Sequence, residues 1–265
     1  MRSGTTRSTS LAAGPIVGFV TVAAALSLAI GCREPAEQTE VQVAVATNFA
    51  GPMEEIVRRF EEETGHKVLA ATGSTGKHYA QIVHGAPFDA FFAADVDRPV
   101  RLEQEGRAIA GSRFTYATGR LVLWSGEEGV VEDGGGVLNE GSYRHLAIAS
   151  PDLAPYGRAA EELLVQRGQW EQLQERLVFG ENIGQTFQFV SSGNAELGLV
   201  ALSQVRQPDQ EMSGSSWVIP RDSHAPIDQQ AILLKEGPEA RALLEFFKTD
   251  AIRDLIRSYG YDTPE

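Results

Sequence analysis

The fold of this chain is decided by Val41-Gln42-Val43-Ala44-Val45-Ala46, a stretch that is β-branched and almost continuously apolar. Strands buried on both faces in a parallel sheet have this composition. A loop at 47–51 follows, and then a segment whose apolar residues recur at helical spacing, at positions 53, 56, 57 and 60. Gly65 is placed to end that helix, because glycine readily adopts the left-handed backbone of a helix C-terminus.

The alternation of strand and helix continues along the chain. We predict a strand at 67–72, a helix at 77–84 and another strand at 88–94. Strands that alternate with helices in this way indicate an α/β fold with parallel sheets.

A second series of elements begins with a strand at 120–124. Its strand at 145–150 is again apolar, and a loop with two prolines leads into a helix, so that 145–167 echoes 41–60 without a fixed repeat. Strands at 197–202 and 230–234 follow. We therefore predict two lobes with a cleft between them, each a mainly parallel sheet flanked by helices. Lobe 1 is predicted to hold residues 41–116 and 225–265, and lobe 2 residues 117–224.

The N-terminus has the layout of a secretory signal peptide, predicted to be 1–31. Two arginines precede an uncharged stretch at 11–31, and the only cysteine of the chain, Cys32, follows it directly. A bacterial lipoprotein carries its lipidated cysteine at this place, although Leu28 lies one position further upstream than usual. Residues 32–40 then form a lipid-anchored tether to the membrane. An uncleaved membrane anchor and a buried free cysteine are the alternatives, and each of these interpretations places the remaining chain outside the cytoplasm.

The chain is strongly acidic, with a formal net charge of −13 that becomes −15 without residues 1–31. Nucleic-acid binding is disfavoured, because it depends on Lys and Arg that neutralise phosphates. A small anionic ligand would have to be held by local dipoles against an unfavourable overall field. The acidic net charge therefore argues against a broad basic funnel as the means of binding an anion.

Four predicted loops each lead into a helix: 47–51, 73–76, 155–157 and 181–184. The first turn of a helix has unpaired N–H groups and the positive end of the dipole, which together suit an anion. Loops at the carboxyl ends of parallel strands gather around one crevice, so two facing lobes could bring four helix starts together. Neutral donors lie in these loops: Thr47, Asn48, Ser74, Thr75 and Tyr156. Taken singly, a Ser, Thr or Asn before a helix is usually a plain N-cap, so the argument rests on the four loops together.

Several long motifs resemble one known family, the periplasmic molybdate-binding proteins. They include 44–49 (AVATNF), 73–82 (GSTGKHYAQI), the specific run 85–95 (GAPFDAFFAAD), 151–157 (PDLAPYG) and 181–183 (ENI). The resemblance extends from about residue 41 to Pro264. Thr75 replaces a serine found in many members, and Ala201 stands where some members have a tyrosine that contacts the anion. This chain has a tyrosine at position 156 instead, and we interpret Tyr156 as the donor that takes the place of the missing tyrosine at 201.

The resemblance implies a periplasmic-binding-protein type II clamshell and an anion held between the lobes by hydrogen bonds alone. Carried over to this sequence, the ligand-binding residues would be Thr47, Asn48, Ser74, Thr75, Tyr156 and the backbone N–H near Ile183. The expected ligand is molybdate or tungstate, with no cofactor and with molybdenum present only inside the oxyanion. The expected partners are an ABC permease and its ATPase, and the protein is expected to be a monomer that catalyses no reaction.

The chemistry of the donors bears on which anion is bound. Molybdate, tungstate and sulfate are fully deprotonated near neutral pH and only accept hydrogen bonds, whereas phosphate keeps a proton and favours a site with a carboxylate. None of the candidate residues is an acid, and a buried carboxylate beside a dianion would cost several kcal/mol. The residue types therefore disfavour phosphate as the ligand. The choice of molybdate over sulfate rests on the family resemblance alone.

Other functional classes lack their signatures. The run Gly73-Ser74-Thr75-Gly76-Lys77 is not a P-loop, which would need Gly at 71 and Ser or Thr at 78, and the five histidines show no metal-site spacing. Two alternatives stay open. One is a receptor of the same fold for sulfate, an organic anion or a sugar, and the more distant one is an α/β hydrolase or transferase, for which we find no nucleophile–base pair.

Overall fold

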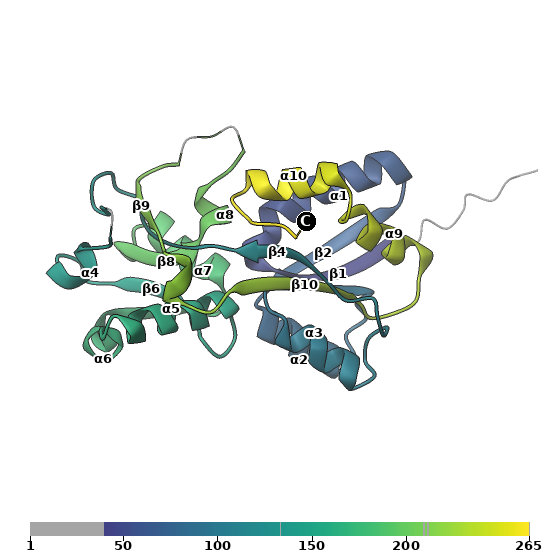
Figure 1. Ribbon diagram of the computed structural model, residues 1–265, viewed down its shortest axis with the longest axis horizontal. Helices are drawn as coiled ribbons and strands as arrows, with labels where there is room; N and C mark the ends of the chain where they lie inside the picture. The colour runs from purple at the N-terminus through teal and green to yellow at the C-terminus, as the bar shows by residue number, and fades with distance from the viewer. Residues whose placement is uncertain (1–39, 133, 209, 211, 265) are drawn as a thin grey trace, which may run out of the picture. The chain divides into compact units, whose positions relative to one another are not determined.

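The computed structural model describes residues 40–264, apart from 133, 209 and 211 (Figure 1). The predicted signal peptide, Cys32 and the tether as far as residue 39 lie outside the described residues. Within the described part, none of the helices is long and apolar enough to cross a membrane.

The first lobe is built on a five-stranded sheet in the order β2-β1-β3-β10-β4. Only β10 runs against the other four strands. The strands are β1 (Glu40–Ala46), β2 (Lys67–Gly73), β3 (Ala90–Ala93), β4 (Phe114–Gly119) and β10 (Ile227–Leu233). The helices are α1 (Ala50–Thr64), α2 (Thr75–Val83), α3 (Asp97–Gln104), α9 (Pro238–Phe246) and α10 (Asp250–Ser258), with a 3-10 turn at Thr47–Phe49.

The second lobe repeats this topology with the order β7-β6-β8-β5-β9, in which β5 alone runs against the others. Its strands are β5 (Leu121–Ser125), β6 (Leu146–Ala149), β7 (Leu177–Gly180), β8 (Leu197–Ala201) and β9 (Ser215–Val218). Its helices are α4 (Val137–Glu140), α5 (Pro155–Gln166), α6 (Trp170–Leu173), α7 (Ile183–Ser191) and α8 (Leu202–Val205), with 3-10 turns at Gln174–Arg176 and Arg221–Ser223. The predicted two-lobed α/β fold with mainly parallel sheets is thus confirmed.

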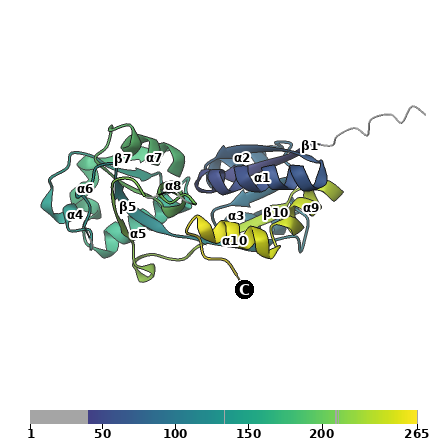
Figure 2. The same ribbon diagram turned by 90° about the horizontal axis from the view of Figure 1, so that it is seen from above.

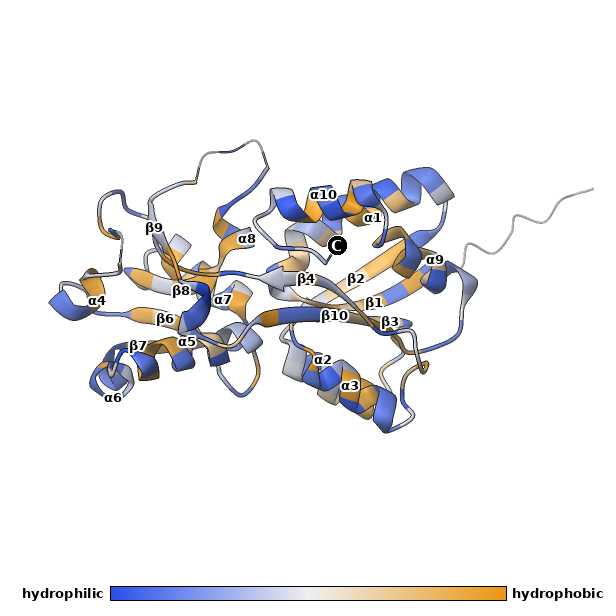
Figure 3. Ribbon diagram, in the orientation of Figure 1, coloured by the Kyte–Doolittle hydropathy of each residue, from blue (hydrophilic) through white to orange (hydrophobic). Residues whose placement is uncertain are grey.

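Each sheet carries an apolar core on both faces, because successive side chains of a strand point to opposite sides. In β1, Val43 and Val45 pack with α1, α9 and α10 on one face, whereas Ala44 packs with α2 and α3 on the other. Helices α1 and α10 come from opposite ends of the chain and lie side by side over the first face (Figures 1 and 2). Hydrophobic colour marks much of β2, whereas part of β10 is hydrophilic in colour, and the helices alternate between both colours along their length (Figure 3). This two-faced burial explains the nearly continuous apolar run in β1.

The chain passes between the lobes at Arg120 and again between Val218 and Ile227. The first crossing comes later than the boundary expected at 116/117. Ala117, Thr118 and Gly119 pair with β10 and therefore belong to the first sheet. These three residues are small or polar and show no alternation typical of a strand, so the sequence did not indicate that the strand extends to residue 119.

Candidate functional site

The four candidate loops begin at matching edges of the two sheets. In the first sheet β1 and β2 run parallel and in register as far as the pair Ala46–Gly73. In the second sheet β6 and β7 run parallel and in register as far as Ala149–Gly180. The loops that follow these strands therefore leave each sheet in neighbouring pairs, at the carboxyl ends of parallel strands.

Contacts between the lobes bring the two pairs of loops together. The Gly76 N–H donates to the Leu153 carbonyl oxygen at 2.9 Å. A Cβ placed on Gly184 would lie 3.1 Å from Cγ2 of Thr47, so the backbone at the start of α7 lies close to the Thr47 side chain. Lys77 and Glu181 form an exposed ion pair across the same junction. The expected convergence of four loops is present in the structure.

The first lobe presents two buried hydroxyl groups at the start of α2. Ser74 is the N-cap residue, and its Oγ accepts the Lys77 N–H at 3.3 Å. Oγ1 of Thr75 accepts the Ala94 N–H at 3.1 Å. A hydroxyl that accepts one hydrogen bond keeps its proton to donate, so both residues can serve an anion. Thr47 differs, because its hydroxyl donates to the Gly73 carbonyl oxygen at 3.2 Å.

The second lobe presents backbone N–H groups at the starts of α5 and α7. Pro155 occupies the first turn of α5 without an N–H, so Tyr156 is the first residue of this helix with a free backbone donor. The N-cap of α7 is Asn182, whose Oδ1 accepts the Gln185 N–H at 2.9 Å. That bond leaves the N–H groups of Ile183 and Gly184 without a partner in the helix.

The side chains of Asn48 and Tyr156 do not face the site as expected. The Asn48 amide nitrogen donates to Oε1 of Gln229 at 2.8 Å and to the Tyr261 hydroxyl at 2.9 Å. The Tyr156 hydroxyl accepts a hydrogen bond from Nε2 of Gln229 at 3.3 Å. Both amide hydrogens of Asn48 are therefore used, and this residue can contribute to anion binding only through its backbone N–H, which corrects its assignment as a side-chain donor. The Tyr156 hydroxyl keeps its proton but lies among buried partners, so the backbone N–H of Tyr156 is the donor that α5 presents to the site.

Charged residues surround the loops but are paired. Arg98 is bonded to Asp95, with only 13% and 9% of the two side chains exposed, and Nη2 of Arg98 donates to the Asp152 carbonyl oxygen of the second lobe at 3.0 Å. Burial raises the pKa of Asp95, which the neighbouring Arg98 counteracts. Among the described residues, no group of three or more His, Cys, Asp and Glu could hold a metal ion. The bridging role of Arg98 was not apparent from its sequence context.

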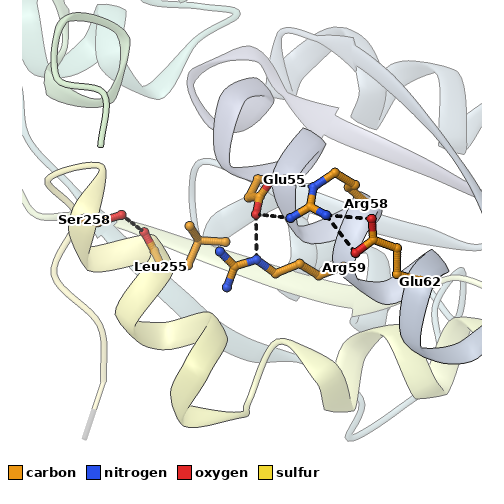
Figure 4. A network of polar contacts seen from close by, with 6 residues as sticks. All are labelled: Glu55, Arg58, Arg59, Glu62, Leu255 and Ser258. Atoms are coloured by element: carbon orange, nitrogen blue, oxygen red, sulfur yellow. Dashed lines mark hydrogen bonds and ion pairs between the residues drawn. The ribbon is translucent and has the colours of Figure 1, made fainter. Parts of the chain in front are cut away.

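A groove of about 680 Å³ borders the loops, and its lining includes Thr47, Gly184 and Ser203. The far side of this groove is the charged face of α1, where Arg58 lies between Glu55 and Glu62 (Figure 4). Hydrogen bonds from Arg58 and Arg59 lower the pKa of Glu55 to about 2. The groove is thus bounded by ionised side chains and gives solvent access to the edge of the loops.

His78 lies on α2, directly after the 73–76 loop, and its burial is expected to make stability depend on pH. Its side chain is buried, with Nδ1 3.1 Å from Oε1 of Gln81 and, within the described part of the chain, no partner for Nε2. Burial lowers the pKa of His78. Below about pH 6.5 the unfolded chain therefore binds a proton that the folded protein excludes, and the free energy of unfolding falls as the pH falls.

We predict that His78→Gln reduces this dependence in urea unfolding measured between pH 7.5 and 5.5, whereas the same change at the exposed His84 does not. Equal slopes for the wild type and His78→Gln would show that His78 is not responsible.

With this geometry established, comparison with known proteins identifies the family. The model of the family described as bacterial extracellular solute-binding protein matches residues 41–262. The chain belongs to this family. This solute-binding protein is 49% identical over 229 residues to the molybdate-binding protein ModA of Azotobacter vinelandii, covering 85% of this chain and 91% of the relative. It is 47% identical over 244 residues to ModA of Rhodobacter capsulatus, covering 91% and 95%.

Solved structures agree with the fold of this solute-binding protein. The periplasmic molybdate-binding protein of Azotobacter vinelandii superposes with a TM-score of 0.83 at 41% identity, covering 85% of this chain and all of that one. The sulfate-binding protein SubI of Mycobacterium tuberculosis gives a TM-score of 0.70 at 11% identity, covering 86% and 88%, which shows the shared fold alone. The solute-binding protein is therefore similar in sequence and in structure to the molybdate-binding protein of Azotobacter vinelandii.

Proposed function

We propose that this protein is the extracytoplasmic solute-binding component of an ABC importer. It binds molybdate, and tungstate in the same way, in the cleft between its lobes. It then delivers the anion to a membrane permease driven by a cytoplasmic ATPase. It acts as a monomer, needs no cofactor and catalyses no reaction. After removal of residues 1–31 a lipid on Cys32 anchors it to the membrane.

The observation that carries the proposal is the set of neutral donors gathered from four loops. Ser74 and Thr75 offer hydroxyl groups, whereas Tyr156 and Ile183 offer N–H groups at the starts of α5 and α7. No carboxylate belongs to this set. A fully deprotonated dianion accepts hydrogen bonds from every side, and helix N-termini stabilise its charge without a cationic side chain. The donors match such a ligand and offer no acceptor for the proton of phosphate.

The identity of the anion is supported by the relatives. Two curated proteins that are nearly half identical to this chain are molybdate-binding proteins, and each is matched over more than nine-tenths of its length. The candidate loops lie within the matched region, which begins at residue 41 in the family model. We therefore assign molybdate rather than sulfate as the transported ligand.

Closure of the lobes completes the proposed mechanism. The anion first binds the donors of one lobe, and the second pair of helix starts then closes onto it. The Gly76–Leu153 hydrogen bond and the Lys77–Glu181 ion pair would form at this step, because each joins one lobe to the other. A ligand that contacts both lobes shifts the population toward the closed form.

Thermal unfolding with added anions tests the proposal. Molybdate and tungstate at a hundredfold excess over their dissociation constants should each stabilise the protein by about 2.7 kcal/mol. Sulfate, phosphate and citrate at the same concentration should give a smaller increase or none. Calorimetric titration then supplies the stoichiometry, for which we expect one anion per chain. An unchanged melting temperature with both molybdate and tungstate would refute the proposal, and a larger response to sulfate would reassign the ligand.

A further inference from the structure

A cluster of buried polar side chains lies where the two lobes meet. Residues of the first lobe contribute most of it, and Tyr156 and Ser203 join from the second. Its members share burial of at least nine-tenths of their surface and hydrogen bonds to one another: Asn48, Tyr116, Tyr156, Ser203, Gln229 and Tyr261. Buried polar groups are costly unless they are satisfied, so such a cluster admits few arrangements of the backbone around it.

Gln229 is the centre of this cluster and is completely buried. Its Oε1 accepts hydrogen bonds from Nδ2 of Asn48 at 2.8 Å and from the Tyr116 hydroxyl at 3.0 Å. Its Nε2 donates to the Tyr156 hydroxyl at 3.3 Å. One amide therefore connects the loop after β1 in the first lobe to the first turn of α5 in the second.

Local backbone features make room for these contacts. The pairing of β10 with β4 passes from Gln229–Ala117 to Gln230–Thr115, so Tyr116 is the additional residue of a β-bulge. A bulge re-aims side chains, and here the Tyr116 hydroxyl reaches Gln229. At the end of β4 a Cβ on Gly119 would lie 2.1 Å from the Tyr156 hydroxyl. Position 119 must therefore be a glycine, because any side chain there would prevent the Tyr156 hydroxyl from reaching Gln229.

The cluster adjoins the donors of the anion site. Asn48 directly follows Thr47, and its carbonyl oxygen accepts hydrogen bonds from Ser203 and Tyr261, both at 2.8 Å. Tyr156 itself carries one of the candidate backbone donors. Fixing the side chains of Asn48 and Tyr156 therefore fixes the separation of backbone donors that belong to different lobes.

We propose that Gln229 is a positioning residue that sets the distance between the two halves of the oxyanion site and thereby selects the anion by size. The inference rests on the proposed function, because the anion whose size is selected is molybdate. A site held at one spacing accommodates a larger tetrahedral anion well and leaves the donors too far from a smaller one such as sulfate. Loosening the spacing should reduce that discrimination as well as the affinity.

The cluster keeps its hydrogen-bonding pattern at neutral pH. Burial raises the pKa of Tyr261 to about 12 and the pKa values of Tyr116 and Tyr156 well above their ordinary range. All three hydroxyl groups therefore stay protonated, and binding measured near neutral pH reports on one state of the cluster.

The neighbouring glutamine provides a matched control for the test. Gln230 is also buried and bonds Arg113 at 2.8 Å and Thr115 at 3.1 Å, both within the first lobe. Calorimetric titration of Gln229→Leu should show molybdate affinity reduced roughly tenfold or more, because buried partners lose their hydrogen bonds. The ratio of molybdate to sulfate affinity, obtained by competition, should fall as well. Gln230→Leu should lower the melting temperature and leave affinity and ratio as in the wild type.

A second variant covers the case in which Gln229→Leu does not fold. Tyr156→Phe removes only the hydroxyl that Gln229 contacts and keeps both the ring and the backbone N–H. It should lower the affinity ratio in the same direction and by a smaller factor. An unchanged ratio in Tyr156→Phe, or equal losses in the two glutamine variants, would overturn the inference. A wild-type protein that does not bind molybdate would instead refute the proposed function, so the two failures are distinguishable.

Discussion

Asn48→Asp is expected to abolish molybdate binding while the chain remains folded. The Asn48 amide nitrogen donates to Gln229 and Tyr261, and the residue is only 2% exposed. A carboxylate there would lose both donations and face Oε1 of Gln229, which releases the contacts that position the backbone N–H of Asn48, and it would add a negative charge next to the anion site. An uncompensated buried charge also costs about 3–5 kcal/mol of folding stability, so the melting temperature should fall together with the affinity.

Calorimetry on Asn48→Asp tests this directly, with circular dichroism to establish that the variant is folded. Asn194→Asp adds the same charge at an exposed position and should bind molybdate as the wild type does. If Asn48→Asp binds within tenfold of the wild type, Asn48 does not lie at the anion site.

Gly76→Val is expected to weaken binding by preventing closure. A Cβ at this position would lie 2.9 Å from the Leu153 carbonyl oxygen and 3.1 Å from Cα of the same residue. The clash lies between lobes, so opening of the cleft relieves it and neither lobe has to unfold. Overpacking costs about 1–3 kcal/mol, and the molybdate affinity should fall roughly 10- to 100-fold.

Small-angle scattering and calorimetry together check this prediction. With saturating molybdate the wild type should become more compact, and Gly76→Val should keep a larger radius of gyration. Gly126→Val is the control, because this residue is exposed outside the four loops and its Cβ would lie 4.0 Å from the Val190 carbonyl oxygen. A variant at position 76 that closes and binds normally would show that this contact is not needed for closure.

Much of the fold could be predicted from local sequence, because its elements follow simple periodicities. The apolar run at 41–46 is a strand, and Gly65 ends α1 with a φ of 75°, as its position suggested. Strand β4 was harder to recognise, because it contains polar and small residues and pairs with β10 more than a hundred positions later. Its contribution to the first sheet depends on a partner that local sequence does not reveal.

The candidate site could be predicted as a set of loops but not in its side-chain detail. Ser74 and Asn182 cap their helices through bonds to residues three positions away, which sequence spacing can suggest. The partners of Asn48 lie 181 and 213 positions away. A polar residue in a loop has the same appearance in the sequence whether it faces a ligand or a buried amide. Gln229 was missed for the same reason, since a lone glutamine in a strand has no local signature.

The order of strands in the first sheet has a consequence for how the chain folds during and after synthesis. Strand β10 lies between β3 and β4, so β4 lacks its neighbour in the sheet until residues 227–233 are available. All strands of the second sheet lie between residues 121 and 218, and that lobe can form from one uninterrupted segment. Pairing across a long loop is slow, because the loop entropy must be overcome first. During synthesis the second lobe could therefore fold before the first lobe is complete. Loss of the C-terminal forty residues would remove β10, the strand between β3 and β4 in the sheet of the first lobe.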